Sequence, residues 1–361
     1  MLQFFDTAFR ASPHQNMLFS PWGIRQCFGM IAAGAGTEGK TEILKKLGLD
    51  QISAVRQIAA RQSLSHSNVQ FNSFNALFLD SCYTLQPGFI RQCSLFYGGK
   101  LYQFDRKRKG ECVRYFNQIV QRESRNLFKD VFSGQILEGD PALVLLNVLY
   151  FKAQWELPFM PHKTVSDTFQ VPGSPPYKVD MMSAEWKIPY YNDGKICGIT
   201  LNYSDPRFKL LLLMPVKSSD PLETVTASLA EKGLDTFLQN SSSQYKTRLK
   251  VPRLKLEHRL ELIPLFRKNG IQKIFDRSCG ALNAMVKDHA LFVSHAEQFI
   301  KLNLDESGTE VAAVTYAGVE TMSLRPENEK INEFYVNRSF VLTLFDTQTG
   351  VVLLTGAILH P

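Results

Sequence analysis

The residues from Gly34 to Thr41 match a phosphate-binding pattern at every position. They read Gly-Ala-Gly-Thr-Glu-Gly-Lys-Thr, which fits GxxxxGK[ST], the loop whose backbone amides cradle nucleotide phosphates. Such a loop follows a strand, whereas the residues before Gly34 predict a helix with Ser20 as its N-cap and Pro21 at its first position. We therefore expect a helix-turn-helix junction in which Thr41 caps the second helix. A P-loop nucleotide-binding protein stays a remote alternative.

Other catalytic patterns are missing from the sequence. It contains no GxSxG, no HExxH and no pair of carboxylates at a catalytic spacing, and its seven histidines stand apart from serine or cysteine nucleophiles along the chain. The six cysteines form no CxxC pair and no metal-like spacing. We therefore expect no enzyme, no metal and no cofactor, and cysteines that are mostly buried free thiols.

The composition predicts a large apolar core. The chain has 361 residues, of which 44% are hydrophobic, enough for one large domain or two ordinary ones. Its net charge of +7 is a modest excess of 41 basic over 34 acidic residues, so it does not indicate nucleic-acid binding. No apolar run reaches the roughly 18 residues that a membrane span needs, and no export signal is visible at the start. We expect binding to neither nucleic acid nor membrane.

One run of positive charge is a candidate binding site. It consists of Arg106, Lys107, Arg108 and Lys109. Such a run could bind a polyanion such as a glycosaminoglycan, although a short charged loop is more often simply solvated.

The stretch from Asp305 to Pro326 has two unlike halves. Its residues from Thr309 to Thr315 are mostly small or β-branched and contain no proline, so they favour a strand. From Gly318 to Glu329 there is no apolar stripe to bury, and Pro326 cannot donate a ladder hydrogen bond. The stretch therefore combines a strand-like half with an exposed, loop-like half.

Long strands mixed with helices predict an α+β protein of one domain, residues 1–361. The residues from Leu143 to Phe151 form an apolar run interrupted only by Asn147, which predicts a strand buried on both faces. An amide in such a strand must find hydrogen-bond partners. Further expected elements are a helix over Cys112–Phe132, a strand over Lys246–Leu256 and a β-hairpin pair over Phe334–Ile358.

Five motifs, taken in order, resemble those of the serpin family over essentially the whole chain. They are Asn16–Ile24 (N-x-x-x-S-P-x-S-I), Gly34–Thr41 (G-A-x-G-x-T), Asn147–Trp155 (N-A-I-Y-F-K-G-x-W), Glu306–Glu310 (the hinge of the reactive loop) and Leu354–Pro361 (F-x-G-x-x-x-x-P). The resemblance implies a large central sheet, smaller sheets, about eight or nine helices and an exposed reactive-centre loop at about residues 306–330. It also makes Gly34–Thr41 a turn rather than a nucleotide site.

Several positions depart from the family pattern. They are Gly23 in place of the second serine, Ile119 in place of a tryptophan, Gln298 in place of a histidine, and Ser339 within the family's R-P-F. Gln298 can still donate and accept hydrogen bonds, but it cannot titrate. We expect its site to have lost a pH response.

The family mechanism implies a bait loop that a target protease attacks and that then inserts into the central sheet as an extra strand. Counting along the loop as the family does places the reactive bond between Met322 and Ser323. Met322 is a flexible apolar side chain, which suits an elastase-, chymotrypsin- or subtilisin-like protease. The expected hinge comprises Glu306, Gly308, Thr309, Glu310, Val311, Ala312, Ala313, Val314 and Thr315.

The resemblance also implies two sites that control insertion. The first, the shutter, comprises Ser20, Asn147 and Gln298. The second, the breach at the top of the sheet, comprises Trp155, Arg253 and Glu306, with an ion pair between the last two.

The resulting expectation is an irreversible suicide-substrate inhibitor, monomeric before it forms a covalent complex with a target serine protease. The alternative within the family is a non-inhibitory carrier or chaperone. We expect an extracellular protein, with a cytoplasmic one as the alternative. Three glycosylation sequons begin at Asn202, Asn240 and Asn337, which is too few to decide between the two compartments.

Overall fold

Three β-sheets form the framework of the molecule. The computed structural model describes residues 1–49, 69–138, 141–287, 290–309 and 330–361. The central sheet contains β2 (Val69–Asp80), β3 (Lys100–Phe104), β4 (Leu143–Gln154), β11 (Leu254–Glu261), β12 (Val293–Leu304) and β13 (Gly308–Thr309). The second sheet contains β1 (Met17–Phe19), β7 (Tyr190–Asn192), β8 (Ile196–Asn202), β9 (Phe208–Pro215), β15 (Phe340–Asp346) and β16 (Val351–Ile358). The third contains β5 (Val165–Phe169), β6 (Tyr177–Trp186), β10 (Lys246–Pro252) and β14 (Ile331–Tyr335).

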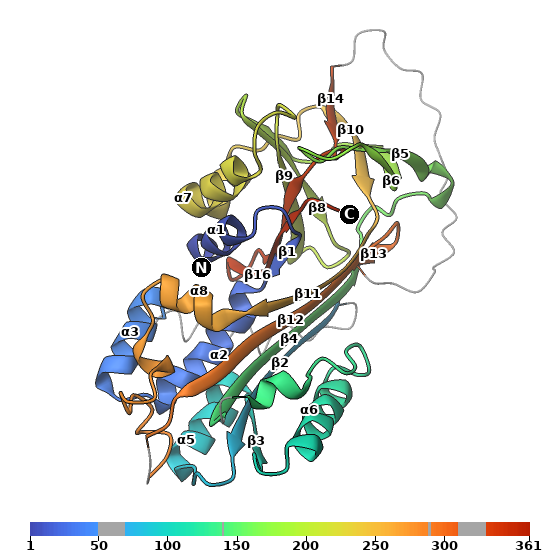
Figure 1. Cartoon of the computed structure of the whole chain (residues 1–361). Helices are drawn as coiled ribbons and strands as arrows, with labels where there is room; N and C mark the ends of the chain where they lie inside the picture. Colours follow the sequence, from blue (N-terminus) through green and yellow to red (C-terminus); the bar gives the residue numbers. More distant parts are fainter. Residues whose placement is uncertain (50–68, 139–140, 288–289, 310–329) are drawn as a thin grey trace.

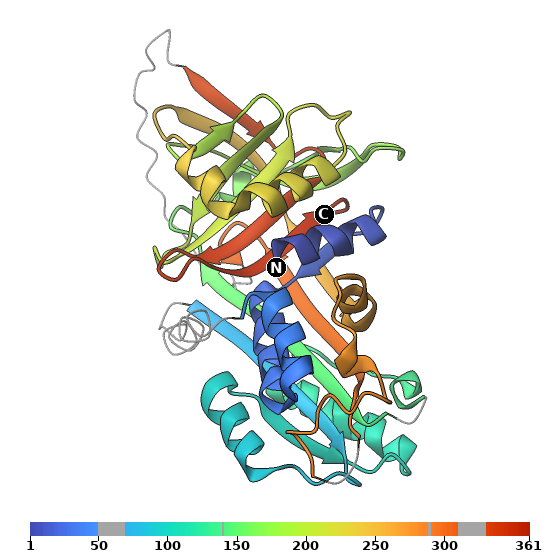
Figure 2. The same cartoon turned by 90° about the vertical axis from the view of Figure 1, so that its left-hand side faces the viewer.

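The strand orders show how the sheets are built. They are β11-β12-β13-β4-β2-β3, β1-β16-β15-β9-β8-β7 and β14-β10-β6-β5. In Figure 1 the long strands of the central sheet cross the lower half of the molecule, and the other two sheets lie above them. The same division is visible in the turned view of Figure 2.

Seven α-helices lie in the described residues, where eight or nine were expected for the whole chain. They are α1 (Leu2–Ala11), α2 (Pro21–Gly34), α3 (Thr37–Leu47), α5 (Pro87–Gln92), α6 (Lys109–Glu123), α7 (Glu223–Gln239) and α8 (Leu262–Lys268). In this part of the chain no helix is long and apolar enough to cross a membrane. The predicted α+β class is confirmed.

The central strand β4 is buried on both faces, as its apolar run predicts. Leu145 and Leu149 belong to the main core, whereas Val144 and Val148 belong to a second core that contains Phe116 of α6. This alternation follows from the two-residue period of a strand. Asn147 therefore projects toward the main core, on the face of the sheet that α2 contacts.

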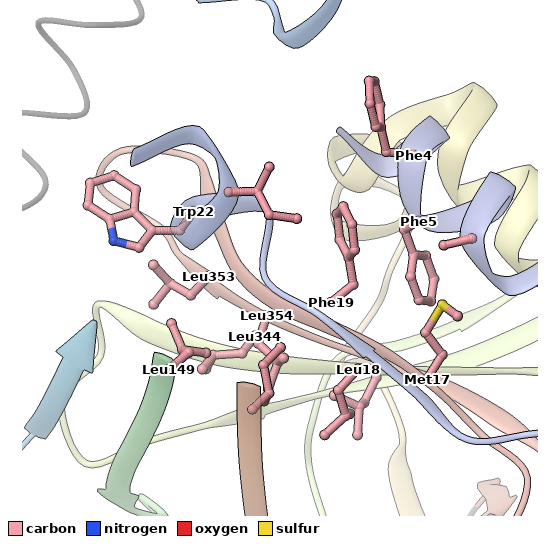
Figure 3. Packing of buried hydrophobic residues seen from close by; sticks show 14 of the residues in the cluster. Phe4, Phe5, Met17, Leu18, Phe19, Trp22, Leu149, Leu344, Leu353 and Leu354 are labelled. Carbon is pink, nitrogen blue, oxygen red and sulfur yellow. The ribbon is translucent and has the colours of Figure 1, made fainter. Parts of the chain in front are cut away.

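The N-terminal segment packs tightly against the second sheet. Figure 3 shows Trp22 of α2 beside Leu353 of β16, and Phe5 of α1 beside Phe19 of β1. Ser20 lies between Phe19 and Trp22, and its hydroxyl accepts a hydrogen bond from Gly23 N at 3.0 Å to cap α2. This packing fixes Ser20 next to the central sheet.

The expected strand over Lys246–Leu256 is wrong as a single element. The chain leaves the third sheet after Pro252 and enters the central sheet at Leu254, so β10 and β11 belong to different sheets. Proline lacks the N–H that continues a ladder, which is consistent with a break there. Arg253 consequently lies at the junction of the two sheets.

Three other expectations need correction. The helix expected over Cys112–Phe132 ends at Glu123, because Arg125 and Asn126 adopt left-handed backbone angles. Phe334 lies in β14 of the third sheet rather than in the C-terminal hairpin. Thr41 does not cap α3 but lies inside it, and Gly36 occupies the N-cap position.

Candidate functional site

The strand β13 separates the upper ends of β4 and β12. Thr309 pairs with Ala153 of β4 on one side and with Leu304 of β12 on the other, antiparallel to both. Below this point β4 and β12 pair directly and in parallel, from Tyr150 and Lys301 downward. We call the line between β4 and β12 the seam: it is open around β13 at the top and closed below.

The first residues of the hinge are already seated in the seam. Thr309 is fully buried, and its hydroxyl lies 2.7 Å from the hydroxyl of Tyr203. Gly308 passes so close to β4 that an added Cβ atom would lie 2.1 Å from Ala153 O. Only glycine fits there without moving the backbone.

Glu306 anchors the start of the hinge. Its carboxylate accepts hydrogen bonds from Arg253 Nε at 3.0 and 3.1 Å and forms an ion pair with Arg253 Nη2 at 2.7 Å; Thr164 Oγ1 also donates to it. Burial by itself raises the pKa of Glu306, but the hydrogen bonds from Arg253 and Thr164 outweigh it and hold this pKa below its ordinary value. Glu306 is therefore a carboxylate at neutral pH.

Trp155 holds the turn that follows β12. Its indole Nε1 donates to Asp305 O at 2.9 Å, and its backbone N donates to Ser307 O at 3.0 Å. Its ring stacks on Tyr203 with centroids 4.5 Å apart. The structure thus brings the three breach residues to one turn, residues 305–307.

The three shutter residues form one buried hydrogen-bonded network. Gln298 Oε1 accepts from Ser20 N at 2.8 Å, and Gln298 Nε2 donates to Asn147 Oδ1 at 2.7 Å and to Ser20 O at 3.3 Å. Ser20 Oγ donates to Leu353 O of β16 at 2.6 Å. The hydrogen bond between Gln298 and Asn147 joins β12 to β4 across the seam. All the side chains in this network are uncharged.

Two further residues belong to this network and were missed from the sequence. Asn147 Nδ2 donates to Asn75 Oδ1 at 2.7 Å, and Cys27 Sγ lies 3.2 Å from the same oxygen. Asn75, Asn147 and Gln298 pair directly across β2, β4 and β12, and we call them the amide row. The signal in the sequence for Asn75 is its position directly before the apolar run from Ala76 to Leu79, where a polar side chain needs a partner.

Gly23 gives the amide row its space. A Cβ atom at Gly23 would lie 2.2 Å from Asn147 Oδ1 and 2.5 Å from Nδ2. Gly23, which departs from the family pattern, is therefore in contact with Asn147, and Asn147 accepts a hydrogen bond from a second departing residue, Gln298. These two departures meet at one amide.

The basic run is partly neutralised. Arg106 lies 3.8 Å from the buried carboxylate of Asp80 and donates its backbone N to the same group at 3.0 Å. Arg108 pairs with Asp105 at 3.6 Å and with Glu111 at 3.5 Å. Lys107 and Lys109 are exposed. The run thus offers less free positive charge than its sequence indicates.

The remaining expected site residues divide into two groups. Glu310, Val311, Ala312, Ala313, Val314, Thr315, Met322 and Ser323 lie outside the described residues. Gly34–Thr41 is described, and helix α2 precedes it where a nucleotide loop needs a strand. No cluster of three metal-binding side chains occurs among residues whose placement is given. All six cysteines are free; Cys82 and Cys279 are exposed and the other four are buried.

Comparison with known proteins identifies the class to which this fold and seam belong. The family model described as "Serpin (serine protease inhibitor)" matches residues 1–361, so the chain belongs to the serpin family. It is 27% identical over 362 residues to Serpin A3-7 of Bos taurus, covering 97% of this chain and 84% of that protein. It is 26% identical over 372 residues to leukocyte elastase inhibitor A of Mus musculus, covering 100% and 97%.

Solved structures share the fold. Native protease nexin-1, crystallised with heparin, has a TM-score of 0.89 at 22% identity and covers 100% of this chain and 96% of its own. Human thyroxine-binding globulin complexed with its ligand has a TM-score of 0.87 at 22% identity, with the same coverage. The fold therefore occurs both in a protease nexin and in a binding globulin.

Proposed function

We propose that this serpin is an irreversible suicide-substrate inhibitor of serine proteases. The observation that carries the proposal is the position of Thr309, which already pairs with both β4 and β12 at the top of the seam. A loop that begins as a strand between these two can lengthen only by parting the direct pairs below it. We further propose that it acts as a monomer.

The register defines the inserted state that we propose. Thr315 follows Thr309 by six residues, Asn147 precedes Ala153 by six, and Gln298 precedes Leu304 by six. Continued antiparallel pairing would therefore place Thr315 between Asn147 and Gln298, on the face occupied by the amide row. The hydroxyl of Thr315 could then bind the amides that now bind each other.

The gain in backbone pairing drives the step. Insertion would replace one parallel junction by two antiparallel ones, and about ten new ladder hydrogen bonds at roughly 1 kcal/mol each would favour it. The uninserted protein is then metastable. Val311 would enter the same face as Thr309; because it is bulkier than the small residue usual there, we expect slower insertion and some turnover of the inhibitor as a substrate.

We place the reactive bond between Met322 and Ser323. The test is incubation with chymotrypsin-, elastase- and subtilisin-like proteases. We expect an SDS-stable complex and a released peptide that begins at Ser323. Cleaved protein without complex for every protease would overturn inhibition, and a peptide that begins elsewhere would overturn the position of the bond.

A hinge variant tests insertion separately from cleavage. Thr315→Arg should be cleaved at the same bond but form no complex, because a guanidinium cannot be buried beside the neutral amide row at low cost. Glu327→Arg, which lies beyond the reactive bond, should inhibit like the original protein. Equal complex formation by both variants would contradict insertion through the seam.

The carrier alternative has one supporting observation, the fold shared with thyroxine-binding globulin. Thermal unfolding before and after loop cleavage distinguishes the two functions. An inserted loop should raise the unfolding temperature strongly. An unchanged temperature together with an absent complex would favour a carrier.

For the compartment, we propose an extracellular protein, supported by the three sequons and by the exposed side chain of Asn240. Treatment of the natural protein with a glycosidase should increase its mobility on a gel. An unmodified protein with a reduced Cys82 would instead indicate the cytoplasm.

We propose that Lys107 and Lys109 carry any polyanion contact of the basic run, since Arg106 and Arg108 already have acidic partners. Retention on a heparin column should weaken in the Lys107→Ala/Lys109→Ala double variant. Unchanged retention would dismiss the contact.

A further inference from the structure

The side chain of Tyr203 connects the second sheet to the hinge. Tyr203 lies directly after β8, and its fully buried ring contacts the rings of Trp155 and Phe151, with centroids 4.5 and 5.1 Å away. Its hydroxyl lies 2.7 Å from the hydroxyl of Thr309, which is also fully buried. The first residue of the loop that is seated in the seam thus has a side-chain partner outside the central sheet.

The two hydroxyls form a closed pair. Within the described part of the chain, they are hydrogen-bonded only to each other. Removing one member would leave the other buried without a partner, which is unfavourable, whereas replacing both by apolar groups of the same shape is nearly neutral. The pair therefore favours the seated position of Thr309 as long as both hydroxyls are present.

Backbone hydrogen bonds on both sides of Tyr203 fix its position against the end of β4. Ser204 N donates to Gln154 O at 2.8 Å, and Glu156 N donates to Asn202 O at 3.0 Å. The tyrosine is therefore held by two sheets, and its hydroxyl occupies a fixed position against which the hinge can dock. A preorganised partner of this kind loses little entropy when the contact forms.

Thr309 is also the point from which an inserted strand would extend. It pairs with Ala153 on one side and with Leu304 on the other, and below it β4 and β12 pair directly. Ordering the first residues of a strand costs conformational entropy before the later pairs can compensate for it. A loop that is already seated at Thr309 has met this cost, so its insertion lengthens an existing strand.

We propose that Tyr203 is a positioning residue for loop insertion, because its hydroxyl holds Thr309 in the seam before the loop is cleaved. This proposal rests on the inhibitory function proposed above. After cleavage the protein has two fates: it either traps the protease in a complex or is released as cleaved inhibitor. With Thr309 unseated, insertion would start later and the protease would complete hydrolysis more often.

Three variants test the hydroxyl pair. Tyr203→Phe removes one hydroxyl, Thr309→Val removes the other, and the double variant removes both while keeping the shapes of the side chains. We expect the ratio of cleaved protein to SDS-stable complex to rise by about 5-fold or more in each single variant, because each leaves one buried hydroxyl unpartnered. In the double variant the ratio should return close to that of the original protein.

Tyr191 provides a matched control in the same sheet. It lies in β7, is buried, and donates its hydroxyl to Asp193 Oδ2 at 2.9 Å. Tyr191→Phe removes a tyrosine hydroxyl and its hydrogen bond away from the hinge. This variant should leave the ratio of cleaved protein to complex unchanged.

A second measurement needs no protease. Amide hydrogen exchange is followed in peptide fragments that contain Gly308 and Thr309. Their protection should fall by about 5-fold or more in each single variant and recover in the double variant. Recovery distinguishes a hydrogen-bonded pair from general damage to the core, because the effects of two unrelated buried substitutions add rather than cancel.

The outcomes separate this proposal from the inhibitory function. Unchanged exchange at the hinge in both single variants would overturn the seating of Thr309 by Tyr203 and leave inhibition standing. Changed exchange with an unchanged ratio would overturn the role in insertion, and so would a double variant that is worse than either single one. If the original protein forms no complex with any protease, inhibition fails and the role in insertion fails with it, whereas changed exchange would still support the hydroxyl pair.

Discussion

The upper end and the middle of the seam between β4 and β12 are held by different chemistry. At the top, the ion pair of Glu306 with Arg253 anchors the hinge, and the arginine side chain is 44% exposed. In the middle, the amide row and Ser20 form a neutral network with no exposed member. Both regions lie on the path of loop entry that we propose, but of the two only the top contains an ion pair that acid or salt can weaken.

This difference has consequences for regulation. The ion pair joins the buried carboxylate of Glu306 to the half-exposed guanidinium of Arg253, so we expect it to weaken with salt and with acid. A buried neutral network is insensitive to both, but it tolerates no change that leaves one amide without a partner. We therefore expect pH and salt to change the stability of the contacts at the top of the seam. In the middle we expect only the loss of a hydrogen-bond partner to change it.

The largest expected effect is at the middle. Asn147→Ala removes the partner of both Gln298 and Asn75, so we expect a loss of about 3 kcal/mol in native-state stability. Urea unfolding followed by fluorescence measures it. Gln103→Ala, exposed on β3 of the same sheet, is the control and should change stability by less than about 0.5 kcal/mol. Equal losses would show that the amide row does not close the seam.

A second substitution tests why Gly23 is there. Gly23→Ala should destabilise by about 2 kcal/mol, because the new methyl group displaces the Asn147 amide. In the Asn147→Ala background the same change should have little effect, and the double-mutant cycle gives the coupling. Gly110→Ala, whose added Cβ meets no atom within 4 Å, is the control. If the two losses in free energy of unfolding were additive, Gly23 and Asn147 would not be energetically coupled.

The top of the seam should show a smaller, pH-dependent effect. We expect Glu306→Gln to lose about 1 kcal/mol at pH 7, because Arg253 is half exposed. The pKa of Glu306 is depressed in the folded protein, so its contribution is complete above its ordinary value, near pH 4.5, and is lost as pH falls through the folded pKa.

The stability difference between the original protein and Glu306→Gln should therefore shrink as unfolding is measured at pH 7, 5 and 3.5. Glu257→Gln, which removes an exposed ion pair with Lys301, serves as the control with a smaller difference at pH 7. If the stability difference between the original protein and Glu306→Gln increased toward acidic pH, the pKa of Glu306 would be raised rather than lowered by folding.

The smallest effect expected at neutral pH comes from restoring the family's titratable residue. In Gln298→His a neutral imidazole can accept from Ser20 N and donate to Asn147 Oδ1, so the loss near pH 8 should be under about 1 kcal/mol. Protonation would remove the acceptor in a buried site, so the folded pKa lies below the ordinary value of about 6.5. Stability should then fall as pH drops through that range, and by more than in the original protein, in which burial already lowers the pKa of His258 and His295. Urea unfolding of both proteins between pH 8 and pH 5 measures the difference.

Several parts of the molecule were predictable from the sequence. The apolar run around Asn147 indicated a strand buried on both faces, and the Ser20-Pro21 pair indicated the start of a helix; both are present. The ion pair of Glu306 with Arg253, expected from the family resemblance, is found in the structure. Apolar periodicity and helix capping depend only on residues close together in the sequence. The ion pair was predictable because residues that match a family motif are expected to make the contacts typical of the family.

Other contacts could not be predicted, because they depend on how the strands pair and on which elements pack closely in the folded protein. Nothing near Asn75 in the sequence indicates that it pairs with Asn147, and nothing near Gly23 indicates that its missing side chain makes room for that same amide. The break after Pro252 assigned two adjacent strands to different sheets and placed Arg253 between them.

The amino-acid sequence was enough to establish the family, the α+β class and the identity of most residues at the top and in the middle of the seam. Only the folded chain shows that three amides form one row and that Gly23 accommodates it. The reason is physical: these contacts join residues tens to hundreds of positions apart, and their geometry depends on how sheets align and pack rather than on any local pattern.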